Sequence, residues 1–135
     1  MSSFGTIKQV LLFFLAIGLW GFILYIRWFA TTAELLFIGT TGIDKMAHLA
    51  GGVFIAAFAE WRLKRLNLAR LAFLLLGIAI GWEVLEFLFD AETKFFYGYA
   101  PDLWRLDSSG DILAAILGGY GYWVFLMDRS GSNAD

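Results

Sequence analysis

Long apolar stretches alternate with short polar ones along the chain, and four of the stretches approach the length of a membrane-spanning helix. An α-helix rises 1.5 Å per residue, so about 20 apolar residues cross the roughly 30 Å of hydrocarbon in a bilayer. With their flanking residues, the predicted helices cover about residues 8–28, 43–61, 69–89 and 110–127. This pattern predicts an all-α fold, a four-helix integral membrane bundle within a single domain (1–129), followed by a flexible tail at 130–135.

Composition narrows the class of protein further. The chain of 135 residues is 60% hydrophobic and only 16% charged, against about 25% charged in a typical soluble domain. The net charge is −2, and the basic residues are dispersed, so we expect no nucleic-acid partner. Because there is no cysteine, disulfides, thiol catalysis and iron–sulfur clusters are excluded.

The first apolar stretch has a second interpretation. Val10 to Ile26 carries no charge, Lys8 precedes it, and Thr31-Thr32-Ala33 resembles a signal-peptide cleavage site. A signal core spans roughly 7 to 15 apolar residues. Since this stretch is longer, we expect a retained first helix.

Basic residues predict the orientation, because loops rich in Lys and Arg stay in the cytoplasm. Arg62, Lys64, Arg65 and Arg70 lie between the second and third helices. With four crossings, that loop shares a side with both termini. We therefore expect a multi-pass protein of the bacterial cytoplasmic (inner) membrane with both termini cytoplasmic.

An aromatic segment separates the third and fourth predicted helices. Its rings alternate with polar groups around Pro101, and Tyr and Trp favour the headgroup level of a bilayer. We predict an interfacial loop that covers the outward end of the bundle as a flap, with Phe96, Tyr97, Tyr99 and Trp104 as its rings.

Three of the predicted helices carry a pair of ionisable residues three or four positions apart, which places both members on one helix face. The pairs are Asp44 with His48, Glu83 with Glu86, and Asp107 with Asp111. His48 and Glu83 each lie about 18 Å above the cytoplasmic end of their helices. An acid at the centre of a membrane costs roughly 2.5 to 3.5 kcal/mol unless it meets a partner or water. We therefore predict one outward-facing ligand-binding pocket formed by these six residues.

Residue pairs at four-residue spacing that contain at least one small residue support close packing of the same three helices. They are Ala47 with Gly51, His48 with Gly52, Gly77 with Gly81, Ala114 with Gly118, and Ala115 with Gly119.

Ordinary structural roles compete with the pocket. Asp44 can cap the second helix, and Ser108 with Asp111 fits a capping box at the start of the fourth. His48 can equally form a structural hydrogen bond with Glu83 or Glu86. Lys45 can neutralise one carboxylate and Arg105 another. Capping does not account for the pair on the third helix.

Clustered carboxylates repel, so the pocket should hold a proton or a cation. Carboxylates with one imidazole and no sulfur suit Mg²⁺, Ca²⁺ or Mn²⁺, and zinc is compatible. The metal ligands would be His48, Glu83, Glu86 and Asp111. Without a metal, His48 and a protonated acid could transfer protons. The sequence has no Walker, zinc-protease or Rossmann motif, so it assigns no reaction.

Two motifs resemble those of VanZ-like membrane proteins, namely Asp44-Lys45-x-x-His48-x-x-x-Gly52 and Asp111-Ile-Leu-Ala-Ala-Ile-Leu-Gly118. Between them, Glu83-x-x-Glu86-Phe87 is similar to the related family typified by YjdF. The chain departs from the VanZ-like pattern at Glu86, where Gln is usual, and at Ala115, where Asn is usual. The resemblance implies a small multi-pass bacterial membrane protein, from a family named for low-level resistance to glycopeptide antibiotics.

These observations favour a membrane protein whose acidic/His pocket binds a cation or the headgroup of a lipid or cell-envelope precursor. One alternative is a metal-assisted hydrolase or transferase acting on a lipid-linked phosphate. Another is a structural or assembly subunit whose acids pair with a membrane protein partner. A homo-oligomer is compatible with each, and transport by a single four-helix chain is the least favoured.

Overall fold

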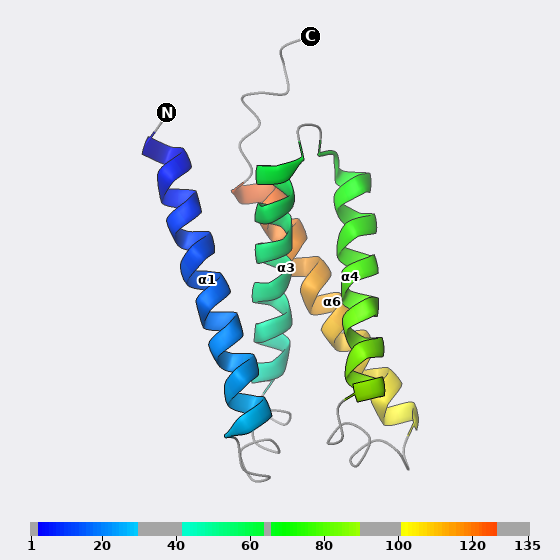
Figure 1. The fold of residues 1–135 in the computed structure, drawn as a ribbon. Helices are drawn as coiled ribbons and strands as arrows, with labels where there is room; N and C mark the ends of the chain where they lie inside the picture. Colours follow the sequence, from blue (N-terminus) through cyan, green and yellow to red (C-terminus); the bar gives the residue numbers. More distant parts are fainter. Residues whose placement is uncertain (1–2, 30–41, 64–65, 90–100, 127–135) are drawn as a thin grey trace.

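The computed structural model describes residues 3–29, 42–63, 66–89 and 101–126, and all regular structure in these ranges is helical. The helices are α1 (Ser3–Trp28), α3 (Ile43–Arg62), α4 (Leu68–Phe89) and α6 (Pro101–Phe125) (Figure 1). The predicted all-α fold is confirmed, and the bounds of α3 and α4 lie within one residue of the prediction.

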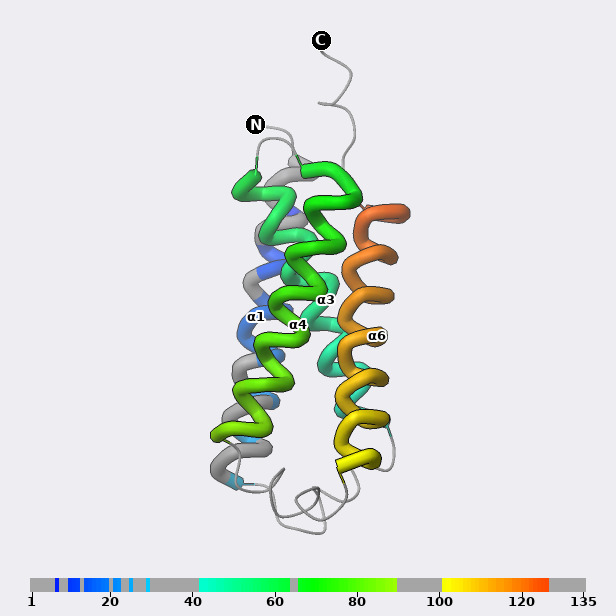
Figure 2. Tube along the Cα trace, turned by 90° about the vertical axis from the view of Figure 1, so that its right-hand side faces the viewer, coloured from blue at the N-terminus to red at the C-terminus, as the bar shows by residue number. Residues whose placement is uncertain are grey.

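Successive helices run in opposite directions along the bundle (Figure 1). The most extensive packing is between α3 and α6, followed by α4 on α6, then α1 on α3. Figure 2 shows α6 on the side of the bundle opposite α1. The ends of α1 and α4 therefore lie at the same end of the bundle as the starts of α3 and α6.

Glycine allows the close approach of α3 and α6. A Cβ added at Gly52 would lie 1.9 Å from the carbonyl oxygen of Ala115, and one at Gly118 would lie 2.0 Å from that of Leu49. These contacts confirm the small-residue prediction at Gly52 and Gly118, whereas a Cβ at Gly51 would meet no described atom within 4 Å, so no close approach occurs there. The prediction was wrong for Gly77 and Gly81, because a Cβ at either would meet no described atom within 4 Å.

The apolar core lies toward the opposite end from the predicted pocket. Ala56, Ala57, Leu71, Leu75 and Tyr122 are buried together there. The Tyr122 hydroxyl donates a hydrogen bond to the Glu60 carboxylate. The three helices α3, α4 and α6 pack around this apolar core, and that packing sets their positions relative to one another along the bundle axis.

The start of α6 corrects the sequence prediction. The helix begins at Pro101 and not near residue 110, so Trp104 is helical and does not belong to a loop. Ser108 and Asp111 lie inside the helix, which removes their predicted capping role. The other rings assigned to the flap (Phe96, Tyr97 and Tyr99) fall outside the described residues.

Asn67 caps the start of α4. Its side-chain oxygen accepts a hydrogen bond of 2.9 Å from the backbone N–H of Arg70, an N–H that lacks a partner within the helix. We expect Asn67→Ala to lower the free energy of unfolding by about 1 kcal/mol. Chemical denaturation of the purified protein measures this, and Asn67→Ser is the control that should retain most of the stability. Equal loss in both variants would contradict the capping role.

Within the described residues, α4 is the helix long and apolar enough to cross a membrane, with a mean hydropathy of 2.0. Only 22% of its most apolar window is buried inside the bundle. Phe73, Ile80, Val84 and Leu88 are among its exposed side chains. This assignment of α4 rests on its length and composition.

Candidate functional site

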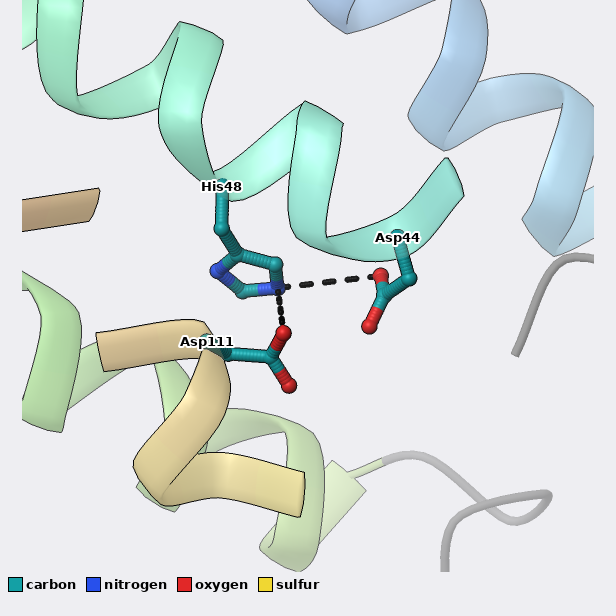
Figure 3. A group of neighbouring side chains, drawn as sticks. All are labelled: Asp44, His48 and Asp111. Atoms are coloured by element: carbon teal, nitrogen blue, oxygen red, sulfur yellow. Dashed lines mark ion pairs between the residues drawn. The ribbon is translucent and has the colours of Figure 1, made fainter. Parts of the chain in front are cut away.

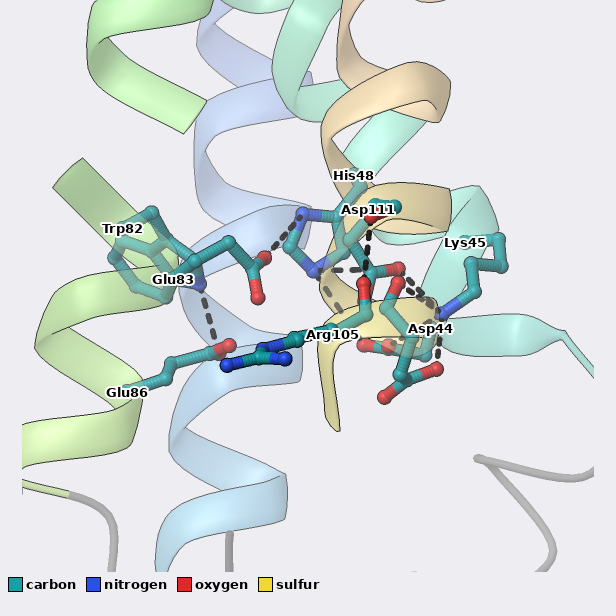
Figure 4. Close-up of polar contacts among 10 residues, drawn as sticks. Asp44, Lys45, His48, Trp82, Glu83, Glu86, Arg105 and Asp111 are labelled. Atoms are coloured by element: carbon teal, nitrogen blue, oxygen red, sulfur yellow. Dashed lines mark hydrogen bonds and ion pairs between the residues drawn. The ribbon is translucent and has the colours of Figure 1, made fainter. Parts of the chain in front are cut away.

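His48 lies at the centre of a polar cluster formed where α3 and α6 begin and α4 ends (Figure 4). Its Nε2 lies 3.7 Å from Asp44 Oδ1 and 3.9 Å from Asp111 Oδ1 (Figure 3). On the other side of the ring, Nδ1 lies 4.0 Å from Glu83 Oε1. The structure therefore brings together acids from three helices around one imidazole.

These separations are longer than a hydrogen bond, which spans about 2.7–3.2 Å for N–H and oxygen. A direct hydrogen bond from His48 to Glu83, one of the alternatives that the sequence left open, is therefore not made. A gap of this length leaves the ring and the carboxylate close enough to contact a shared third group.

Asp44 lies in the first turn of α3, and the cap position is occupied by Gly42 in the left-handed conformation at φ 75°. Glycine adopts this conformation without steric cost. The Asp44 carboxylate is directed to His48 and Lys45 instead of capping the helix from the N-cap position.

Lys45 belongs to the cluster, although the predicted pocket omitted it. Its Nζ lies 2.5 Å from Asp107 Oδ1, 2.7 Å from Asp111 Oδ1 and 3.8 Å from Asp44 Oδ2. One ammonium group thus neutralises acids from both α3 and α6. In the sequence, only the position of Lys45 next to Asp44 indicated that it could belong to the cluster. Its contacts with Asp107 and Asp111 depend on the packing of α6 against α3.

Arg105, which was expected to neutralise another carboxylate of the pocket, pairs with an acid outside it. Its guanidinium pairs with Asp102 at 3.4 Å, one turn earlier on α6, and both side chains are largely exposed. Such a surface pair contributes little to stability.

Glu83 is a buried acid of the cluster that Lys45 does not pair with. The residue is only 5% exposed, and its Oε1 is buried without a hydrogen-bond partner among the described residues. A buried carboxylate is costly unless its charge is paired, so the free oxygen beside His48 indicates a position where a ligand can bind.

Glu86 lies one turn from Glu83 on the same face of α4. Its Oε1 accepts a hydrogen bond of 2.7 Å from the indole Nε1 of Trp82. This bond orients the carboxylate while leaving its remaining acceptor positions available.

Two groups of ligand atoms in the cluster have the spacing for a metal ion. Asp44, His48 and Asp111 form one, and His48, Glu83 and Glu86 form the other, each within 4.8 Å. In the first group, Lys45 already pairs with both acids. The second group therefore suits an added cation better.

An apolar cavity of about 190 Å³ adjoins the cluster between α1, α3 and α4. Asp44, His48, Trp82 and Glu86 form its polar part. The rest of the lining is apolar or small, and includes Leu19, Phe22, Gly51, Ile55 and Ile78. The cavity is thus polar at one part and apolar over the remainder.

All six residues of the predicted pocket lie in or beside the cluster, with Asp107 bound to Lys45 and Glu86 lining the cavity. Trp104 packs against Phe87 on α4, with ring centroids 4.7 Å apart. This contact joins the start of α6 to the end of α4 next to the acids.

No family model, curated protein or solved structure matches the chain.

Proposed function

We propose that the chain is an integral membrane protein of the VanZ-like type that binds a cation in the acidic/His cluster. The observation that carries this proposal is the Glu83 carboxylate, which is buried and has an oxygen without a hydrogen-bond partner, 4.0 Å from His48. Such a group is costly in a dry interior unless a positive charge compensates it.

The balance of charge supports the same conclusion. Five carboxylates lie around one imidazole and one ammonium group, namely those of Asp44, Glu83, Glu86, Asp107 and Asp111. Lys45 pairs with acids of α3 and α6 but with neither acid of α4. The negative charge on α4 therefore remains for a bound cation, either a hard metal ion or an organic ammonium group.

The membrane setting rests on hydropathy and exposure. Most residues of the apolar α4 are exposed, and α1 has a similar uncharged stretch from Val10 to Ile26. Four crossings with cytoplasmic termini would place the cluster at the outward end, since the basic loop at 62–70 lies at the other end. The ligand would then arrive from the outer face of the bacterial cytoplasmic membrane.

The test is a titration of the full-length protein in detergent with Mn²⁺ and, separately, with methylammonium. We expect saturable binding of one or both. Glu83→Gln keeps the size of the side chain but removes its charge, and should weaken that binding about 10- to 100-fold, the value of a hydrogen bond to a charged group. Electron paramagnetic resonance of free Mn²⁺ and calorimetry measure the two titrations.

Asp102→Asn is the matched control, because Asp102 is an exposed acid on α6 that pairs with Arg105 and not with the cluster among the described residues. It should bind as the wild type does. If the wild type binds neither cation, or if Glu83→Gln binds as tightly as the wild type, the proposed function is wrong.

A further inference from the structure

We infer that the cation is the ammonium head of an amphiphile whose apolar part occupies the cavity between α1, α3 and α4. The inference rests on the proposed function and specifies the chemical class of its ligand. The main evidence is that three residues, Asp44, His48 and Glu86, belong both to the polar cluster and to the lining of the cavity. An ammonium group bound by the acids would therefore have its apolar part directly beside the apolar lining.

Lys45 shows how the cluster holds a primary ammonium group. Its Nζ lies within 2.7 Å of two carboxylates and 3.8 Å from a third. The other half of the cluster repeats this chemistry, with Glu83 and Glu86 beside His48 and their nearest ligand atoms within 4.8 Å. An ammonium group has three donors, and two carboxylates with an imidazole nitrogen supply three acceptors.

The cavity fits the apolar part of such a molecule. Its volume is about 190 Å³, and an apolar cavity of about 150 Å³ in another protein holds benzene. Phe22, Ile55 and Ile78 line it with hydrocarbon. A bare metal ion would use only the polar part and would leave the apolar lining without a role.

Gly51 makes the cavity testable apart from the acids. It lines the cavity, and a Cβ added there would meet no described atom within 4 Å. Leucine at this position would therefore extend into the cavity without displacing the backbone. Leucine also favours a helix more than glycine does.

The experiment compares methylammonium with hexylammonium on wild type, Gly51→Leu and Gly77→Leu. Gly77 is the matched control, since it also has open space around its Cα and does not line the cavity. The detergent micelle takes up hexylammonium equally in all three samples, so the differences between variants report the protein. Calorimetry at fixed detergent concentration gives the dissociation constants.

We expect Gly51→Leu to weaken hexylammonium binding at least tenfold, about the effect of losing two buried methylene groups. Methylammonium binding should change less than twofold, and Gly77→Leu should leave both unchanged. The inference is overturned if Gly51→Leu weakens both ligands alike or neither, or if Gly77→Leu has the same effect as Gly51→Leu.

The same titrations distinguish failure of the amphiphile ligand from failure of the cation site. Binding of Mn²⁺ without any binding of either ammonium compound would overturn the amphiphile and leave the cation site in place. Binding of none of the three probes to the wild type would overturn both.

Discussion

Replacing Gly52 by leucine is expected to lower the free energy of unfolding by about 3 kcal/mol, the upper end for overpacking a close-packed site. The added Cβ would lie 1.9 Å from the carbonyl oxygen of Ala115. This atom is part of the α6 backbone, so no rotamer change can relieve the clash. The helices α3 and α6 would have to separate, and the thermal midpoint in detergent, followed by circular dichroism, measures the loss.

Gly51→Leu is the control for this prediction. Gly51 precedes Gly52 on α3, but a Cβ there would meet no described atom within 4 Å, so the same leucine should not lower the free energy of unfolding and should raise it by up to about 1 kcal/mol through helix propensity. If the two variants had the same thermal midpoint, the close approach of α3 and α6 at Gly52 would be wrong.

The sequence predicts the helices best where hydrophobic pattern and turn chemistry agree. The apolar run of α3 is preceded by Gly42, which adopts the left-handed conformation at the N-cap. The apolar run of α4 is preceded by Asn67, which caps that helix through its side chain. Both helices therefore begin close to where the apolar run begins. The start of α6 was missed because its first turns are polar. Pro101 was interpreted as part of a loop, although proline is common at the first position of a helix, and that is where it lies.

The sequence predicted those features of the candidate site that depend only on helix geometry, such as the depth of a residue along its helix. Equal depth on antiparallel helices placed His48 and Glu83 at one level, and the structure has them 4.0 Å apart. Spacing cannot decide which partner a helix face meets. The Gly77 and Gly81 pair has the same four-residue spacing as the packed glycines, but no backbone approaches it. The bond from Lys45 to Asp107 joins residues 62 apart in sequence, so it depends on how α3 and α6 pack.

The second large effect is expected from Lys45→Met. Removing one member of a buried ion pair costs about 3–5 kcal/mol, because the remaining charge is left unpaired. Asp111 is only 2% exposed, whereas the Lys45 side chain is 34% exposed, so we expect the lower end, about 3 kcal/mol. Methionine keeps much of the length and apolar surface of the lysine stem. The free energy of unfolding in detergent measures the change.

The double variant Lys45→Met/Asp111→Asn identifies the cause. Neutralising Asp111 removes the unpaired charge, so the double variant should regain at least half of the stability lost by Lys45→Met alone. Arg105→Met is the control, since its pair with Asp102 is exposed and should be worth at most about 1 kcal/mol. If Lys45→Met were no more destabilising than Arg105→Met, Lys45 would not be the internal counter-ion of the cluster. The acids of α4 would then no longer differ from those of α3 and α6 in being open to an added cation.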